Sequence, residues 1–478
     1  MNYDVIVVGA GVIGGMLARE LSRYQLSLCL LEKENDVARG ASAANSGIIH
    51  GGYDPESGTL KAQLNTCGVS LLYRAAKELK VPHRNNGSMV CAFGAEEEEQ
   101  IRILYDRGVE NGIWGLRILT GAEVRAMEPS LSENVTLALW VPTAGIISPY
   151  ELNLAAVGNA MDNGAHLKCN FRVSKIEPNK EGFLVTSADG ETVQGRFLVN
   201  CAGAFSDEIA SLAGDDFFRI CPRAGEYLLL DQEVGAMVSH TIFRVPTKAG
   251  KGILVTPTAD GNLLLGPTAD QVKSPFDTQT TAQGLEKVKK EALSMVPSIP
   301  LSKVITSFTG VRASTSSGDF IIQSSARVEG LLHLAAIDSP GLTCCVSIAR
   351  RAVRELEQMG LCLDKKEKWI ATREDPRAFQ DLSIQEKNAW IQRDPSYGRI
   401  VCRCEKISEG EILNAIRQNP PARDLDGVKR RTRSGMGRCQ GGFCAPHVMR
   451  LLGAELEIPQ EEVTKSGGGS VMIKGRIG

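Results

Sequence analysis

The sequence predicts an α/β protein in which a doubly wound sheet is interleaved with an antiparallel sheet and followed by a small helical domain. Three observations carry this prediction. The chain opens on a strand–helix–strand pattern, its middle alternates between apolar and polar residues with many turn signals, and two close cysteine pairs lie near its end. The length of 478 residues agrees with two or three domains.

The bulk composition is that of an ordinary globular protein, with 43% apolar and 23% charged residues. The 54 Lys and Arg residues nearly balance the 56 Asp and Glu residues, so the net charge of -2 argues against a nucleic-acid partner. The first residues lack the pattern of a signal peptide, and no apolar run is long enough for a transmembrane segment. We therefore expect a cytoplasmic protein, with peripheral membrane attachment through partner subunits as the alternative.

The elements of the doubly wound sheet are read from short apolar runs. Asp4–Val8 is typical of a buried strand, Val12–Tyr24 has helical spacing, and Ser27–Leu31 reads as a second strand. Phe197–Cys201 and Leu331–Ala336 are further apolar runs bounded by turns. We expect all four strands to belong to one sheet.

The remaining segments differ in pattern. Phe217–Ile322 alternates and contains turn signals such as Thr258–Asn262, which predicts an antiparallel sheet beside the first layer. Residues 365–397 are charged and lack periodicity, so they read as a linker. A compact module follows at 398–455, and residues 456–478 read as a loose tail.

A glycine motif lies between the first strand and the first helix. Gly9 permits a tight turn, Gly11 lets the backbone approach a pyrophosphate, and Gly14 allows the helix to pack closely on the strand. Phosphates are stabilised at a helix N-terminus by free N–H groups and by the helix dipole. Glu32 ends the second strand, where a carboxylate accepts hydrogen bonds from a ribose. These features predict a dinucleotide site.

Three later segments decide which dinucleotide is expected. Arg39 to Gly52, Asn200 to Asp207 and Asp338 to Thr343 resemble the second, third and last FAD-contacting segments of the D-amino-acid oxidase superfamily, and the resemblance covers residues 1 to about 355. It implies FAD as the cofactor. Beside the glycines and Glu32, the implied FAD contacts are Ser42, Asn45, Ser46, Gly47, Ala202, Gly203, Gly310, Asp338, Gly341, Leu342 and Thr343.

The resemblance also implies how the two larger domains share the chain. A Rossmann-like FAD-binding domain is expected from about 1–80, 140–215 and 320–364, interleaved with an antiparallel-sheet substrate domain from about 81–139 and 216–319.

Within the superfamily, the nearest branch resembles FAD-dependent glycerol-3-phosphate dehydrogenases and oxidases together with L-2-hydroxyglutarate oxidases. The motifs that carry this resemblance are Asn45 to Gly52, Gly58 to Ala62, Gly225 to Tyr227, Lys251 to Thr258 and Gly310 to Arg312. They are fairly specific for the branch but discriminate poorly between its members.

His50 is the predicted catalytic base. Oxidation of a secondary alcohol needs a group that accepts the hydroxyl proton near neutral pH, and histidine suits this task. In the resembling enzymes the histidine at this place faces the substrate, whereas the alternative is a structural histidine bonded to a backbone carbonyl. The other histidines are expected to be surface or packing residues: His83, His166, His240, His333 and His447.

The substrate anion requires cationic partners. Arg312 offers a planar fork suited to a carboxylate or a phosphate. Lys251 matches a substrate-contacting lysine of the family, and Lys248 is its close rival. The alternative for each is a surface ion pair.

Four of the 13 cysteines form two tight pairs, Cys402 with Cys404 and Cys439 with Cys444. Such a set can hold zinc or an iron–sulfur cluster. Zinc ribbons favour two intervening residues, whereas these pairs enclose one and four. The other nine cysteines read mostly as small core residues.

The module resembles the [2Fe-2S] domain of bacterioferritin-associated ferredoxin, although that protein has two residues between its second cysteine pair. The four-residue spacing resembles the form appended to glycerol-3-phosphate dehydrogenase and opine-oxidase subunits. A capping box at Ser408 to Glu411 predicts one short helix, and Pro446–Leu452 predicts another that stops at Gly453. The second pair is surrounded by basic residues that could offset the cluster charge, dock a partner or merely face solvent: Lys429, Arg430, Arg431, Arg433 and Arg438.

Flavin and cluster together favour a dehydrogenase, because a flavin oxidase reduces O2 without a metal centre. The preferred substrate is sn-glycerol 3-phosphate, with L-2-hydroxyglutarate or a related 2-hydroxy acid as the alternative and an opine or amino acid third. Electrons would leave singly through the cluster to a partner subunit in a hetero-oligomer. The competing hypotheses are a non-catalytic electron-transfer subunit and a redox sensor.

Overall fold

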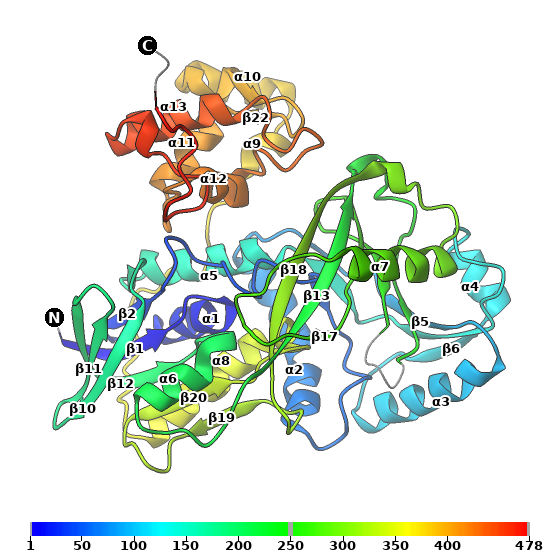
Figure 1. Cartoon of the computed structure of the whole chain (residues 1–478), viewed down its shortest axis with the longest axis horizontal. Helices are drawn as coiled ribbons and strands as arrows, with labels where there is room; N and C mark the ends of the chain where they lie inside the picture. The colour runs from blue at the N-terminus through cyan, green and yellow to red at the C-terminus, as the bar shows by residue number, and fades with distance from the viewer. Residues whose placement is uncertain (1, 247–251, 476–478) are drawn as a thin grey trace.

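The computed structural model describes residues 2–246 and 252–475 and confirms the predicted α/β class. Figure 1 shows three bodies: a nucleotide domain that contains the first sheet, a second domain built on a larger sheet, and a C-terminal domain in orange and red. The C-terminal domain lies over the nucleotide domain, beside helix α5 (Pro149–Asp162).

The sheet of the nucleotide domain has eight strands in the order β10-β11-β12-β1-β2-β9, with β20 beside β12 and β19 beside β20. Its middle strands are parallel, and β10, β11 and β19 are antiparallel additions. The strands are β1 (Asn2–Val8), β2 (Leu28–Leu31), β9 (His166–Lys168), β10 (Val173–Asn179), β11 (Gly182–Ser187), β12 (Thr192–Asn200), β19 (Ile321–Ser324) and β20 (Leu331–Ala335).

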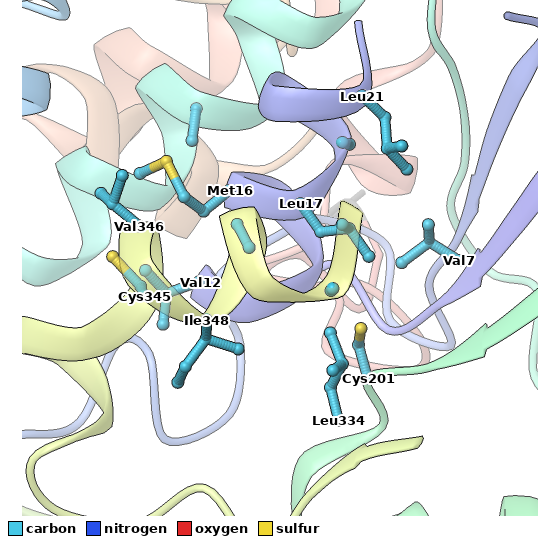
Figure 2. Close-up of a cluster of buried hydrophobic side chains, with 14 of the residues drawn as sticks. Val7, Val12, Met16, Leu17, Leu21, Cys201, Leu334, Cys345, Val346 and Ile348 are labelled. Carbon is cyan, nitrogen blue, oxygen red and sulfur yellow. The ribbon is translucent and has the colours of Figure 1, made fainter. Parts of the chain in front are cut away.

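Helices on one face of this sheet pack on Val5 and Val7 of β1. The helix that contains Ile209 packs on the opposite face with Ile6 and Val8, because alternate residues of a strand point to opposite sides. Figure 2 shows Val7 of β1 next to Leu17 and Leu21 of the first helix. Ile348, from the helix of the same domain that starts at Gly341, lies below them in this view. The helices are α1 (Val12–Leu21), which ends earlier than predicted, α2 (Leu60–Glu78), α5, α6 (Ser206–Leu212) with the preceding η1 (Gly203–Phe205), and α8 (Gly341–Gln358). Helix α8 packs on both α1 and α2.

The second domain has a nine-stranded sheet in the order β17-β13-β16-β15-β14-β5-β7-β6, with β18 beside β13. The prediction of an antiparallel sheet holds except between β5 and β14, two strands distant in sequence that pair in parallel. The strands are β5 (Ser88–Ala92), β6 (Arg117–Thr120), β7 (Leu137–Val141), β13 (Cys221–Leu230), β14 (Thr241–Arg244), β15 (Leu254–Pro257), β16 (Leu263–Gly266), β17 (Asp270–Gln271) and β18 (Val304–Ser314).

Helices α3 (Ala95–Glu110), α4 (Gly121–Met127) and α7 (Ala282–Met295) pack on this sheet, together with η2 (Gln232–Val234) and η3 (Leu301–Lys303). The end of the segment predicted as antiparallel, Ile321–Ser324, belongs instead to the nucleotide sheet as β19. A small sheet of β3 (Ile48–Ile49), β8 (Gly145–Ile147) and β4 (His83–Arg84) joins the two domains.

The segment 365–397, predicted as a linker, contains helices α9 (Ala378–Asp381) and α10 (Ile384–Arg393) and the turn η4 (Pro395–Gly398). A capping box between Ser383 and Glu386 starts α10, and the rings of Phe379, Trp390 and Tyr397 pack on one another. The segment predicted as a linker therefore contains secondary structure and an aromatic cluster of its own.

The C-terminal domain consists of β21 (Ile400–Cys402), β22 (Ile407–Ser408), α11 (Glu409–Arg417), α12 (Leu425–Thr432), α13 (Ala445–Leu456) and η5 (Gln460–Glu462). The predicted capping box at Ser408 is present. Helix α13 does not stop at Gly453, because this buried glycine packs close to the carbonyl of Ile458 and the helix turns only at Glu457. Within the segment predicted as a loose tail, Val463 is buried and Thr464 pairs with Val471.

Candidate functional site

A cleft of about 910 Å³ lies between the nucleotide domain and the second domain. This volume is at the upper end of the usual range for ligand pockets, roughly 300–1,000 Å³. Most of the predicted cofactor residues line it: Gly9, Gly11, Glu32, Ser42, Asn45, Ser46, Ala202, Gly203, Gly310, Asp338, Gly341 and Leu342. Gly14, Gly47 and Thr343 are not among its lining residues.

The glycine motif forms the turn from β1 into α1. Gly9 has a φ of 102°, and a Cβ atom there would lie 2.5 Å from the carbonyl oxygen of Cys201. A Cβ atom at Gly14 would lie 2.0 Å from the carbonyl oxygen of Gly9, so this glycine is required for packing. Gly11 faces the cleft at the N-terminus of α1, where a phosphate is favoured by the helix dipole.

Glu32 is buried at the end of β2, and its carboxylate accepts hydrogen bonds from the backbone N–H groups of Ala10 and Glu34 at 2.9 and 3.1 Å. Burial raises the pKa of Glu32, although these two amides oppose the shift. A buried carboxylate that still lines the cleft is a suitable acceptor for ribose hydroxyls.

The segment after Arg39 closes the cleft from the other side. Ser42 Oγ accepts a hydrogen bond from Val12 N at 2.8 Å, and Asn45 Oδ1 accepts one from Gly47 N. The Asn45 amide also donates to two backbone carbonyls, so this side chain holds the loop in shape. Asp338 is held by Lys61 Nζ at 2.6 Å and by Ser314 Oγ at 2.9 Å. Together with the glycine turn and Glu32, these residues fit an extended dinucleotide.

His50 directly follows β3 and lines the cleft. Its backbone N–H donates to Thr343 Oγ1 at 2.9 Å, and its carbonyl accepts from Asn65 Nδ2 at 2.8 Å. Its Nε2 atom lies 3.3 Å from Ser339 Oγ, and its ring lies 6.0 Å from that of Phe243. The other five histidines do not line the cleft.

Arg312 also lines the cleft from β18, and its Nη2 donates to the carbonyl of Thr268 at 3.2 Å. Lys251 and Lys248, the other predicted anion-binding residues, lie outside the described residues. The polar side chains of the cleft that sequence reasoning missed include Ser339 and Arg223. Ser339 stands within a segment already identified as FAD-contacting, so it had a local signal, whereas Arg223 lies outside the Gly225 motif, two residues before it.

The four cysteines of the C-terminal domain meet as two pairs. Cys404 Sγ lies 3.6 Å from Cys439 Sγ, and Cys402 lies next to Cys444. The thiol of Cys444 donates a hydrogen bond to Cys402 and, with backbone amides nearby, lowers the pKa of Cys402 to about 5.

Among the residues with a described placement, no three metal-binding side chains converge on one ion position. Two separate cysteine pairs suit the two irons of a [2Fe-2S] cluster, each of which takes two thiolates, better than they suit one tetrahedral zinc. The residues present therefore fit the cluster.

Four of the five basic residues near the second cysteine pair form ion pairs with carboxylates of the two larger domains. Arg430 and Arg431 form ion pairs with Asp36 of the nucleotide domain, at 2.5 and 2.8 Å. Arg433 binds Asp260 at 2.7 Å, and Arg438 binds Glu233 at 2.5 Å.

These contacts attach the C-terminal domain to both larger domains. Tyr150 at the start of α5 also contacts Met436 of the cluster domain and Asp260. Arg430, Arg431 and Arg433 are therefore not a solvated surface, whereas the side chain of Arg438 stays exposed beside its ion pair.

In the part of the chain that the structure describes, none of the helices combines the length and the apolar character needed to span a bilayer.

Comparison with known proteins agrees with both sites. Residues 4–355 match the FAD dependent oxidoreductase family, and residues 400–454 match the BFD-like [2Fe-2S] binding domain. Glycerol 3-phosphate dehydrogenase of Caloramator mitchellensis is 42% identical over 474 residues, which cover 99% of this chain and 98% of that protein. Human mitochondrial L-2-hydroxyglutarate dehydrogenase is 29% identical, over 75% of this chain and 89% of that protein.

A solved structure of L-alpha-glycerophosphate oxidase from Mycoplasma pneumoniae, with FAD bound, is similar at a TM-score of 0.75 and 32% identity. The similarity covers 78% of this chain and 98% of that one. The cofactors of this chain are FAD and a [2Fe-2S] cluster, and its activity is that of an oxidoreductase acting on a CH–OH donor. The chain thus belongs to the FAD dependent oxidoreductase family.

Proposed function

We propose that this chain oxidises sn-glycerol 3-phosphate to dihydroxyacetone phosphate. The observation that carries the proposal is that His50 and Arg312, a proton acceptor and an anion-binding fork, line the same cleft as the nucleotide-binding residues. The similarity to a glycerol 3-phosphate dehydrogenase along 99% of the chain supports this substrate over other CH–OH donors.

His50 takes the hydroxyl proton of the substrate in this proposal. Its backbone is fixed on both sides by Thr343 and Asn65, which places the start of the side chain at the cleft. Nε2 lies within reach of Ser339 Oγ, and this hydroxyl can hold the neutral imidazole in place before the substrate binds. Bound FAD supplies the hydride acceptor that no amino-acid side chain can provide.

Arg312 holds the substrate anion, and Lys251 or its neighbour Lys248 is the second cation that the family resemblance implies. The guanidinium of Arg312 donates to a backbone carbonyl and forms no ion pair with a carboxylate among the described residues. Its remaining donors are therefore available for a ligand.

We further propose that the enzyme is a dehydrogenase and that its cluster domain transfers electrons singly to a partner protein. Cys404 is exposed, so the cluster position is accessible to another chain, whereas Cys402 and Cys444 are buried. A hetero-oligomer with an electron-accepting subunit follows from this role.

The test is anaerobic turnover of purified holoenzyme with an artificial dye acceptor. We expect reduction of the dye with sn-glycerol 3-phosphate, little activity with O2, and an electron paramagnetic resonance signal from the cluster after substrate addition. L-2-Hydroxyglutarate is the second candidate, because the human relative named above acts on it. Turnover with L-2-hydroxyglutarate alone contradicts the proposed substrate, and rapid turnover with O2 contradicts the dehydrogenase assignment.

A further inference from the structure

We propose that Arg223 is a second anion-binding residue of the cleft, and that Arg223 and Arg312 together hold a phosphate dianion of the substrate. This inference rests on the proposed function and specifies its substrate class as a phosphomonoester.

The two arginines are direct neighbours across two antiparallel strands. Arg223 of β13 stands opposite Arg312 of β18 in the strand register. Four residues along, Tyr227 stands opposite Phe308, and their rings are stacked at 4.7 Å, which shows that this row of residues shares one face of the sheet. Arg223, Tyr227 and Arg312 all line the cleft from this face.

Glycines leave room for the two long side chains. Gly225 lies between Arg223 and Tyr227 in this row, and a Cβ atom there would lie 2.5 Å from Arg312 Nη2. Gly310, opposite Gly225, packs against the carbonyl of Ala44. This row of side chains therefore faces the segment that leads to His50.

The electrostatics of the pair are unusual. Like charges directly opposite each other on neighbouring strands destabilise a sheet. Arg223 donates to the carbonyl of Ala269 at 3.3 Å and Arg312 to that of Thr268 at 3.2 Å, and neither pairs with a carboxylate among the residues whose contacts are described. Both guanidinium groups are half-buried. A bound anion removes the repulsion that the protein itself leaves uncompensated.

Phosphate is the anion that fits two guanidinium forks best. A phosphomonoester carries about two negative charges and three terminal oxygens, so each arginine can form charge-assisted hydrogen bonds with it. A single carboxylate has one charge and two oxygens, which one arginine already satisfies. The pyrophosphate of the nucleotide is expected at a different place, the N-terminus of α1.

The experiment uses holoenzyme with inorganic phosphate and with sn-glycerol 3-phosphate. Phosphate binding is followed by the change in the visible flavin spectrum and by the rise in melting temperature. For Arg223→Met we expect the phosphate Kd and the KM for glycerol 3-phosphate to rise about tenfold to a hundredfold, because a charge-assisted hydrogen bond is lost. The kcat is expected to change much less. The phosphate Kd and the KM of Arg223→Lys should lie between those of Arg223→Met and those of wild type.

Arg219→Met is the matched control. Arg219 is exposed, does not line the cleft and donates to the carbonyl of Phe218. The Arg219→Met substitution should leave the phosphate Kd and the KM unchanged.

The outcomes separate this inference from the proposed function. An Arg223→Met enzyme that keeps the wild-type phosphate Kd and KM overturns the role of Arg223, even if glycerol 3-phosphate is the substrate. Loss of bound FAD in Arg223→Met and Arg223→Lys also overturns it, because the residue would then hold the nucleotide. If wild type binds phosphate through Arg223 but does not oxidise glycerol 3-phosphate, the phosphomonoester site stands and the proposed substrate fails.

Discussion

His50 is held at both of its backbone polar groups by residues from two helices, α8 and α2. Substituting the side chain should therefore remove the imidazole without moving the cleft wall. This separation of backbone and side-chain roles makes the residue a suitable target for testing the chemical step.

We expect His50→Ala to slow anaerobic reduction of the flavin by substrate about a hundredfold to ten-thousandfold, since it removes the group that accepts the proton. The FAD content should stay at the wild-type level. The measurement is stopped-flow absorbance at the flavin band. His83→Ala is the control, because His83 bonds the carbonyl of Val81 outside the cleft. Reduction of His50→Ala at the wild-type rate would favour an electron-transfer subunit over an enzyme.

The sequence is informative about single residues when a local motif identifies them. His50 and Arg312 stand in recognisable segments, and both line the cleft. Arg223 could not be assigned in this way, because its significance depends on the strand register that places it opposite Arg312. The ion pairs of the basic run before Cys439 were not predicted for a related reason: the partners Asp36, Asp260 and Glu233 are distant in sequence.

At the scale of elements, the turn from β1 into α1 depends on contact between two glycines. Gly14→Ala places a methyl group 2.0 Å from the carbonyl oxygen of Gly9, so the helix must move away from the strand. We expect loss of bound FAD and a stability lower by at least about 1–3 kcal/mol, the usual cost of overpacking. Flavin fluorescence after denaturation and the melting temperature measure the two effects. Gly469→Ala, which adds a methyl group in open space, should change neither.

The cysteine pairs allow a second prediction for an element. Cys444→Ser should abolish the iron content and the cluster signal but leave FAD bound, because the C-terminal domain has a hydrophobic core of its own. Metal analysis and visible absorbance provide the measurement. Cys362→Ser, at an exposed cysteine, is the control. One zinc per chain in wild type, with no iron, would contradict the cluster.

Element boundaries were predictable where a cap was visible and unreliable elsewhere. The capping box at Ser408 was identified correctly, yet the same signal at Ser383 and Glu386 was overlooked within a charged segment. Helix α10 has no buried residue among those described in it. Gly453 did not end α13: it is buried within the helix, which continues to Leu456 and ends at Glu457 in the left-handed conformation.

At the scale of the whole molecule, ion pairs hold the cluster domain against the nucleotide domain. Asp36 is the centre of one such contact. Burial raises the pKa of this carboxyl, but the guanidinium groups of Arg431 and Arg430 outweigh burial and lower the pKa to about 2 from its ordinary value of 3.8. The depressed pKa stabilises the folded chain above about pH 4, and the contribution is lost as the pH falls towards 2.

We expect Asp36→Asn to lower the free energy of unfolding by about 2 kcal/mol at pH 7 and the difference from wild type to fall by about half near pH 3. Urea denaturation at several pH values provides the measurement. Asp426→Asn removes an ion pair with the largely exposed Lys465 and should cost less than about 1 kcal/mol. A difference between Asp36→Asn and wild type that does not depend on pH would show that Asp36 is not held as a carboxylate by the two arginines.

The nucleotide domain is assembled from three stretches of chain, and this bears on its biosynthesis. β1 is incomplete without β12 on one side, and β12 in turn pairs with β20. α8 then packs on α1 and α2 from the far end of the same domain. The chain must therefore be synthesised as far as Gln358 before the nucleotide domain can fold completely and bind FAD. The glycine turn is synthesised first but cannot bind FAD before that point. A truncated translation product that ends before α8 should therefore contain no bound flavin.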